Sequence, residues 1–286
     1  MKRRELIRNI SFIAGAMAIN KQNLMAGNKG LFEDGLIEHS ACRWCYNDIP
    51  LEALCAAAQD IGIKSIEIVG PADWPILQKY GLTCAMGTDT WVSLTEGFNQ
   101  PKLHAELQKN YLQLLDKAAD NGIPNVIVFS GNRNGLDDKT GLENCAVGLD
   151  PIAKHAEKVG VMVAMELLNS KVNHKDYQCD HTPWGVELVE KVGSPNFKLL
   201  YDIYHMQIME GDLIATIKKY SDHIAHYHTG GVPGRNEIDE TQEIYYPAVI
   251  NAIKETGFQG YLGQEFIPKR DDKIASLRQG VEICSV

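Results

Sequence analysis

The chain is 286 residues long, and its 44% hydrophobic and 23% charged residues match an ordinary globular protein with enough apolar mass for a large core. This composition excludes disordered, collagen-like and coiled-coil chains. The 28 lysines and arginines against 37 aspartates and glutamates give a formal net charge of -9 at pH 7, which argues against nucleic acid as a partner because phosphates repel an acidic surface.

The first residues have the layout of a cleavable export signal. A basic start (Lys2-Arg3-Arg4) precedes an apolar stretch over 10–19, and Ala16-Met17-Ala18 lie near its end, before polar residues. The arginine pair resembles the twin-arginine type of signal, and the apolar stretch is too short to span a membrane. We expect 1–26 to be an export signal or an N-terminal extension, the alternative being an amphipathic helix of the fold. The protein would be periplasmic or exported if the leader is used, and cytoplasmic otherwise.

From about residue 37 onward, β-rich segments alternate with amphipathic helical patterns such as 103–121. We expect eight strands, at 38–45, 64–69, 82–86, 124–129, 161–166, 197–202, 223–229 and 260–265. Helical patterns between them end in glycine, at Gly62, Gly122, Gly160, Gly193 and Gly257. The alternation predicts a parallel sheet flanked by helices.

No linker or low-complexity stretch interrupts these repeats. Single α/β barrels commonly have about 250 residues, so the length is compatible with one domain. The sequence therefore predicts the α/β class and a single (β/α)8 TIM barrel over 37–286, in preference to a doubly wound open sheet.

The last four predicted strands end in side chains that can bind a metal. These residues are Glu166, Asp202, His228 and Glu265. The carboxyl ends of barrel strands meet at one mouth, where gathered carboxylates repel one another unless a cation neutralises them. Any one of these residues is equally well explained as a solvated loop residue. Their placement on four consecutive strands is what predicts a metal site.

The donor types favour Mn²⁺ or Mg²⁺, with Co²⁺ and Zn²⁺ as alternatives, because oxygen donors predominate. The sequence has no dinucleotide-binding or P-loop motif, so no nucleotide cofactor is expected. Cys42-Arg43-Trp44-Cys45 has C-x-x-C spacing but lacks the second cysteine pair of a zinc site. We therefore assign this motif no role from the sequence.

Five segments carry a family resemblance, and they are Met165–Asn169, Tyr201–Gln207, His226–His228, Val232–Glu237 and Gly263–Phe266. In order, spacing and strand placement together, they resemble the hydroxypyruvate isomerase group of the xylose isomerase-like TIM barrels. The resemblance is strongest from about residue 124 to 268 and looser in the first third of the chain.

The resemblance implies a divalent metal held by the four strand-end residues, with Glu166 and Glu265 as the proton-transferring groups. It implies that substrate oxygens are bound by His205, Arg235, Asn169 and Glu237. Hydroxypyruvate isomerases usually have glutamine at the position of His228, whereas the related ketose 3-epimerases have histidine. Both activities are therefore candidates.

We accordingly predict a metal-dependent isomerase that transfers a proton through an enediolate, acting on a small polyhydroxy carbonyl compound or oxo-acid. The alternatives are a ketose 3-epimerase on the same site and a non-catalytic, exported carbohydrate-binding barrel. An endonuclease IV-like phosphodiesterase fits less well, because it would need extra histidines and a basic groove. Family analogy suggests a homodimer, and we expect neither nucleic acid nor a membrane span.

Overall fold

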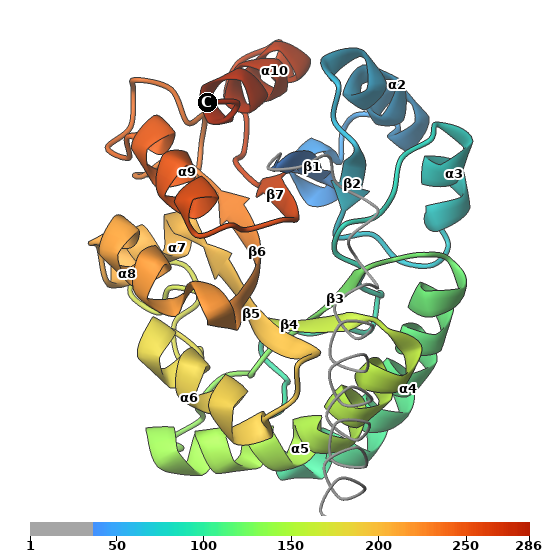
Figure 1. Cartoon of the computed structure of the whole chain (residues 1–286), viewed down its shortest axis with the longest axis vertical. Helices are drawn as coiled ribbons and strands as arrows, with labels where there is room; N and C mark the ends of the chain where they lie inside the picture. The colour runs from blue at the N-terminus through green and yellow to red at the C-terminus, as the bar shows by residue number, and fades with distance from the viewer. Residues whose placement is uncertain (1–36) are drawn as a thin grey trace, which may run out of the picture. The chain divides into compact units, whose positions relative to one another are not determined.

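The computed structural model describes residues 37–286, so the candidate export signal at 1–26 lies outside the described part of the chain. The described residues contain seven strands, all paired in parallel (Figure 1). They are β1 (Glu38–Cys42), β2 (Ser65–Glu67), β3 (Asn125–Val128), β4 (Met162–Glu166), β5 (Phe197–Asp202), β6 (Ile224–Thr229) and β7 (Tyr261–Gln264). Their order in the sheet is β2-β1-β7-β6-β5-β4-β3.

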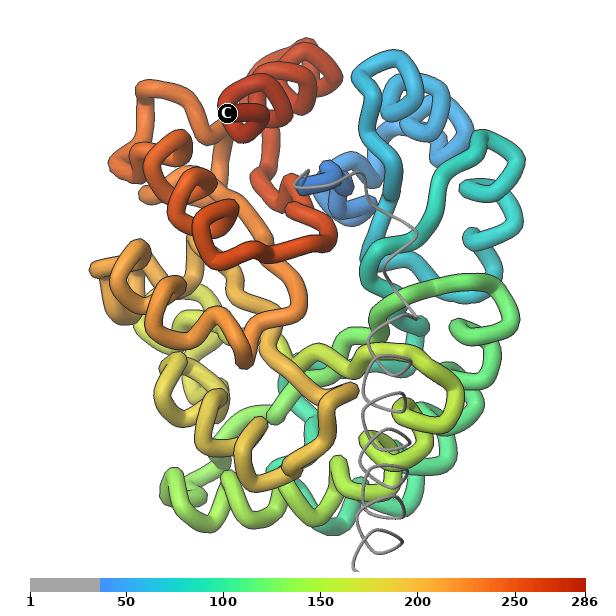
Figure 2. Tube along the Cα trace, in the orientation of Figure 1, coloured from blue at the N-terminus to red at the C-terminus, as the bar shows by residue number. Residues whose placement is uncertain are grey.

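The predicted third strand takes the eighth position in the ring, although it pairs only through isolated bridges. Within 82–88, Thr83 bridges to Ser65 of β2 and Gly87 bridges to Val126 of β3, both in parallel. This segment joins the two edge strands of the seven-stranded sheet. The ring therefore closes into the predicted (β/α)8 barrel, and Figure 2 traces the chain around it.

The helices form an outer ring around the strands (Figure 1). They are α2 (Leu51–Ile61), α3 (Trp74–Lys79), α4 (His104–Asp120), α5 (Asp138–Val159), α6 (Thr182–Val192), α7 (Ile203–Met209), α8 (Leu213–Tyr220), α9 (Tyr246–Glu255) and α10 (Lys273–Cys284). The helix predicted at 103–121 is thus confirmed as α4. The five glycines predicted to end helices, Gly62, Gly122, Gly160, Gly193 and Gly257, all have positive φ, between 66° and 93°. Glycine adopts this left-handed conformation without the cost that a Cβ atom imposes.

Two of the predicted strands extend too far. The strand expected at 38–45 ends at Cys42, because Arg43–Tyr46 turn into the short 3-10 helix η1. The strand expected at 64–69 ends at Glu67, because Ile68 has a φ of 58° and a left-handed residue cannot continue a strand. The last residue of β1 is therefore Cys42, and the last residue of β2 is Glu67.

The strands are buried on both faces, as expected when helices cover a parallel sheet. Val163, Ala164 and Met165 of β4, for example, are all fully buried. Among residues 37–286, no helix combines the length and apolarity needed to cross a bilayer. The barrel thus supplies a rigid frame whose strand ends position polar side chains.

Candidate metal centre

The four predicted ligand residues lie together at the mouth of the barrel. Glu166 and Asp202 are the last residues of β4 and β5, His228 is the penultimate residue of β6, and Glu265 directly follows β7. One donor atom from each of them lies within 4.8 Å of the other three. All four side chains are buried. The structure therefore brings the whole predicted ligand set to one point.

The imidazole of His228 faces two of the carboxylates. Its Nδ1 atom lies 2.7 Å from Glu265 Oε2 and 3.3 Å from Glu166 Oε1. These contacts do not have the geometry of hydrogen bonds, so Nδ1 and Glu166 Oε1 are both buried without a hydrogen-bond partner. Buried polar atoms without partners cost free energy, and a cation held between them would satisfy both. This donor set therefore fits a divalent metal.

Asp202 is held in place by helix α7, which it precedes. Its Oδ1 accepts a hydrogen bond from the backbone N–H of His205 over 3.1 Å, which caps the helix. Its Oδ2 accepts from Arg235 Nη2 over 2.9 Å. Capping thus fixes the orientation of the carboxylate before any ligand binds.

Arg235 reaches back into the mouth from the loop after β6. Gly234 and Arg235 have φ values of 95° and 59°, and the left-handed backbone at Arg235 is uncommon for a residue with a side chain. The guanidinium donates to Asp202 and, over 2.5 Å, from Nη2 to Glu265 Oε2. Strained backbone of this kind clusters at functional sites. Arg235 therefore supplies a fixed positive charge beside the carboxylates.

The environment shifts the pKa values of the carboxyl groups of the cluster in different directions. Burial raises the pKa of Glu166, and the pKa of Asp202 lies well above its usual value for the same reason. Burial also acts on Glu265, but the charges of Arg235 and His228 outweigh it and hold the pKa of Glu265 well below its usual value. Because a raised pKa favours the protonated carboxyl, a metal bound here would compete with protons for Glu166 and Asp202.

His205 and Asn169 lie against each other beside the cluster. The backbone N–H of Asn169 donates to His205 Nδ1 over 3.1 Å, so this ring nitrogen is the acceptor. The other ring nitrogen, Nε2, lies 3.0 Å from Arg235 Nη1. Burial lowers the pKa of His205 well below its usual value, which favours a neutral ring. The binding of substrate oxygens by His205 and Asn169 stays a prediction.

The carboxylate of Glu237 forms its hydrogen bonds outside the four-residue cluster. Its Oε1 accepts hydrogen bonds from the backbone N–H groups of Lys269 and Arg270, over 2.9 and 3.1 Å, and from Ser276 Oγ over 2.9 Å. These bonds tie the loop after β6 to the segment leading into α10. This carboxylate thus accepts hydrogen bonds from three nearby donors. The role of Glu237 in substrate binding stays a prediction.

Sequence reasoning missed two residues of the site, Trp44 and Glu67. The Nε1–H of Trp44 donates to Glu265 Oε1 over 2.7 Å. Glu67 Oε1 accepts from His228 Nε2, which lies 2.6 Å away on the far side of the ring from the cluster. Glu67 also closes a strand, so the strand-end rule would have found it had the end of β2 been placed correctly. Trp44 carried no such signal.

All seven cysteines are free and buried. Cys42 and Cys45 of the C-x-x-C motif are therefore not joined in a disulfide. Cys42 instead lies next to the four-residue cluster, with its Sγ 3.3 Å from Glu67 Oε1 and 3.8 Å from His228 Nε2. Burial raises the pKa of the Cys42 thiol well above its usual value, so it acts here as a donor and not as a thiolate.

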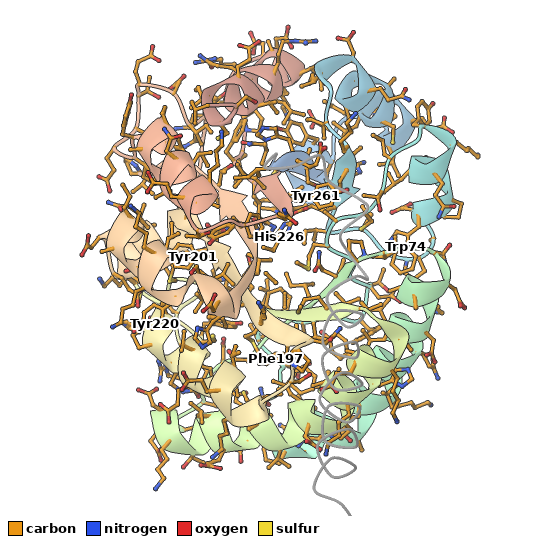
Figure 3. The ribbon with its side chains drawn as sticks, in the orientation of Figure 1. Trp74, Phe197, Tyr201, Tyr220, His226 and Tyr261 are labelled. Carbon is orange, nitrogen blue, oxygen red and sulfur yellow. The ribbon has the colours of Figure 1, made fainter. Side chains whose placement is uncertain are left out.

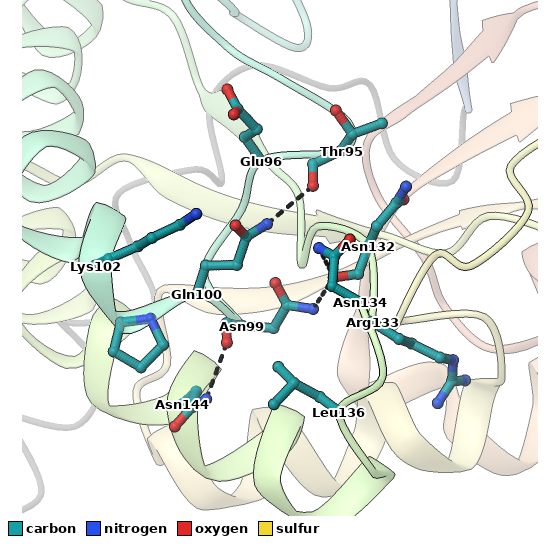
Figure 4. Close-up of a pocket in the computed structure, with 11 residues that line it drawn as sticks. Thr95, Glu96, Asn99, Gln100, Lys102, Asn132, Arg133, Asn134, Leu136 and Asn144 are labelled. Atoms are coloured by element: carbon teal, nitrogen blue, oxygen red, sulfur yellow. Dashed lines mark hydrogen bonds between the residues drawn. The ribbon is translucent and has the colours of Figure 1, made fainter.

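A polar cavity of about 660 Å³ lies between the loop after 82–88 and the loop after β3 (Figure 4). Amide side chains dominate its wall, but several of them brace the loops. Asn99 Nδ2 donates to the backbone oxygen of Asn132 over 2.7 Å, and Asn144 Nδ2 donates to that of Asn99 over 2.9 Å. None of the four cluster residues lines this cavity. Its amides connect the loop after 82–88 with the loop after β3 and with α5.

Comparison with known proteins places this geometry in a family context. The model of the xylose isomerase-like TIM barrel family matches residues 55–284. The chain is 28% identical to 2-oxo-tetronate isomerase of Cupriavidus necator over 234 residues, which cover 77% of this chain and 87% of the relative. It is 32% identical to hydroxypyruvate isomerase of Escherichia coli over 143 residues, which cover 44% of this chain and 55% of the relative.

Solved structures show the same fold. The AP endonuclease, family 2, from Brucella melitensis superposes with a TM-score of 0.77 at 25% identity, covering 86% of this chain and 99% of that one. D-psicose 3-epimerase from Clostridium cellulolyticum superposes with a TM-score of 0.71 at 18% identity, covering 87% and 98%. Because the sequence identity to the epimerase is only 18%, this similarity shows a shared fold and nothing more.

Proposed function

The chain belongs to the xylose isomerase-like TIM barrel family, and from this premise we propose that it is a metal-dependent isomerase of a small hydroxy-carbonyl compound. The observation that carries the proposal is the convergence of Glu166, Asp202, His228 and Glu265, with donor atoms within 4.8 Å of one another. The relatives named as hydroxypyruvate and 2-oxo-tetronate isomerases support an oxo-acid as substrate.

We propose Mn²⁺ or Mg²⁺ as the metal. Three carboxylates and one imidazole form the cluster, and no thiol belongs to it. Hard oxygen donors suit these ions, whereas thiolates would select zinc or copper. When bound, such a cation supplies Lewis-acid stabilisation of the negative charge that develops on the substrate oxygens, contributing several kcal/mol.

The two glutamates carry the proton. When Glu166 gives one oxygen to the cation, its other oxygen is left to accept a proton from the carbon next to the carbonyl. Both oxygens of Glu265 are engaged, Oε1 by Trp44 and Oε2 by Arg235. We assign proton removal to Glu166 and proton return to Glu265, each worth roughly 10²- to 10⁴-fold in rate.

Arg235 and His205 would orient the substrate. The guanidinium of Arg235 is planar and offers several N–H donors, which match a carboxylate better than a single hydroxyl. Arg235 lies over the rings of Trp44 and Tyr204, with its Cζ 5.2 Å from each ring centre. This stacking holds the guanidinium in a fixed plane, which supports an oxo-acid as the natural substrate class.

A ketose 3-epimerase is the second candidate, and His228 favours it, because the resemblance associates histidine at this position with epimerases. Both reactions remove and return a proton beside a carbonyl, so the same cluster serves either. They differ in which carbon then receives a proton, because an isomerase protonates the former carbonyl carbon, whereas an epimerase returns a proton to the opposite face of the carbon that lost it. A nuclease is disfavoured by the net charge of -9, which opposes binding of a phosphate backbone.

We also propose that residues 1–26 direct export. The support is the basic and apolar pattern of the sequence. Sequencing of the mature N-terminus from a cell fraction outside the cytoplasm tests this point separately from the enzymatic proposal. A mature protein that retains Met1 would contradict cleavage.

The decisive experiment is incubation of metal-stripped protein with hydroxypyruvate, 2-oxo acids and small ketoses in deuterated water, with and without Mn²⁺. The proposal predicts an isomer and incorporation of deuterium at the carbon next to the carbonyl, only with metal. Deuterium exchange without metal, or no conversion of any compound with metal, would contradict it. A non-catalytic carbohydrate-binding barrel predicts ligand binding without exchange.

A further inference from the structure

Glu67 is a buried carboxylate behind the metal centre. It is the last residue of β2 and pairs in register with Cys42 of β1. Its side chain is fully buried. Figure 3 shows one of its partners, His226, within the ring of strands. A buried charge is costly unless specific donors compensate it, so its presence calls for a reason beyond packing.

Three donors converge on one oxygen of this carboxylate. His228 Nε2 lies 2.6 Å from Glu67 Oε1, His226 Nε2 lies 3.0 Å from it, and Cys42 Sγ lies 3.3 Å from it. The second oxygen, Oε2, has no hydrogen-bond partner. The contacts thus serve to fix Oε1 at one point, directly behind the ring of His228.

The backbone around Glu67 is shaped to allow this contact. A Cβ atom on Gly263 of β7 would lie 2.3 Å from Glu67 Oε1 and 2.7 Å from His228 Cδ2, so no side chain fits there. Ile68, the next residue after Glu67, has a φ of 58°, which is a strained conformation for a branched side chain. The absence of a side chain at Gly263 of β7 and the strained backbone directly after β2 both occur where Glu67 contacts His228.

We propose that Glu67 is a positioning residue for the metal centre, which accepts the Nε2–H of His228 and thereby presents the Nδ1 lone pair to the cation. A neutral imidazole has one N–H, and its hydrogen bond decides which nitrogen is left to bind a metal. Carboxylates in this outer position orient metal-binding histidines and increase their basicity. His226 and Cys42 hold Glu67 in place. The inference rests on the proposed function, because it presumes the metal.

The distances within the cluster are consistent with this arrangement. His228 Nδ1 points toward Glu166 and Glu265, whereas Nε2 points toward Glu67. The ring therefore has two carboxylates at Nδ1 and one carboxylate at Nε2. The proton that Nδ1 would carry is the one that a metal displaces, and the proton on Nε2 stays with Glu67.

The test compares Mn²⁺ affinity in wild-type protein and Glu67→Gln, measured by electron paramagnetic resonance of free Mn²⁺ during titration. Gln keeps the size and an acceptor oxygen but removes the charge. We expect Mn²⁺ to bind 10- to 100-fold more weakly in the variant. Asp180→Asn is the matched control, because Asp180 is also a buried carboxylate contacting a histidine, with Oδ1 2.8 Å from His181 Nδ1.

The outcomes separate the two proposals. If wild-type protein binds no Mn²⁺, the proposed function fails. If wild-type protein binds Mn²⁺ and Glu67→Gln binds it equally well, the function stands and the positioning role fails. Thermal unfolding of the metal-free proteins distinguishes positioning from stability, since we expect Glu67→Gln to melt within a few degrees of wild type. A variant that does not fold without metal would overturn the inference, because Glu67 would then be a structural group.

A measurement on the unmodified protein provides a second arm. The long-range ¹H–¹⁵N spectrum of the Mg²⁺-loaded protein reports which histidine nitrogen carries hydrogen, and the His228 signals are assigned by their loss in His228→Gln. We expect His228 to carry hydrogen on Nε2 alone. Hydrogen on Nδ1 in the loaded protein would overturn the inference.

Discussion

Trp44 and Glu265 meet at the mouth of the barrel although 221 positions separate them in the sequence, with the indole N–H donating to Glu265 Oε1 over 2.7 Å. The contact forms because β1 and β7 are neighbouring strands, so the residues that follow them lie side by side. Trp44 also contacts Arg235 through its ring. One indole thus holds both a proposed acid–base group and the proposed substrate-binding arginine.

Replacing Trp44 by phenylalanine should lower kcat. Trp44→Phe keeps an aromatic ring under Arg235 but removes the donor to Glu265, and a hydrogen bond to a charged group is worth about 1.5–3 kcal/mol. We expect kcat on hydroxypyruvate to fall at least 10-fold, measured at saturating Mn²⁺. Trp184→Phe is the control, because its Nε1 donates to the backbone oxygen of Asp138, away from the cluster. If both variants had the same kcat, the hydrogen bond from Trp44 to Glu265 would not contribute to catalysis.

Removal of either proposed acid–base group should abolish turnover. We expect Glu166→Gln and Glu265→Gln each to lose 10²- to 10⁴-fold or more in kcat, with circular dichroism unchanged, because a positioned acid or base contributes about that much. Glu143→Gln, at an exposed carboxylate paired with Lys191, should retain wild-type rates. Near-normal turnover in either site variant, with metal content verified, would rule out the two-carboxylate scheme.

Arg235→Lys should discriminate between substrate classes. Lysine keeps the charge but loses the planar fork that binds a carboxylate, so KM should rise at least 10-fold for an oxo-acid. For a neutral ketose the change should be much smaller. Arg133→Lys, at an arginine paired with Asp138 and Asp180, is the matched control. A KM increase that is equal for both substrate classes would argue against carboxylate binding by Arg235 and favour the epimerase.

His39 should make the fold sensitive to acid independently of the site. Burial lowers the pKa of His39 from 6.5 to about 4 in the folded state. The unfolded chain therefore binds a proton that the folded state rejects, so stability falls as the pH drops from about 6.5 to 4. Between pH 7 and pH 5 this group accounts for a loss of about 2 kcal/mol.

Urea unfolding of metal-free wild-type protein and His39→Asn at both pH values tests this prediction. The variant should lose less stability on acidification, by an amount similar to that loss. Identical losses in the two proteins would show that His39 is not the responsible group, and attention would turn to the buried histidines of the mouth.

The predictable part of the fold comes from local patterns. Glycines such as Gly62 and Gly160 mark helix ends because the left-handed backbone there requires no long-range information. Glu166 and Asp202 could be placed at the mouth because each ends a strongly apolar strand, and strand ends converge in a barrel. Regular spacing alone therefore located the cluster.

The rest depends on contacts that local patterns do not encode. The expected strand at 64–69 placed Glu67 in its interior, whereas the left-handed backbone at Ile68 ends the strand at Glu67. Trp44 reaches Glu265 only because the first and last strands pair. The segment 82–88 closes the ring through isolated bridges, which depend on both neighbouring strands.

The most direct test of the account is a crystal structure of the protein grown with Mn²⁺, with an anomalous difference map collected at the manganese absorption edge. The account predicts a single strong peak about 2.0–2.4 Å from donor atoms of Glu166, Asp202, His228 and Glu265, as expected for oxygen and nitrogen ligands. A map with no peak there, or with manganese bound elsewhere on the barrel, would contradict it.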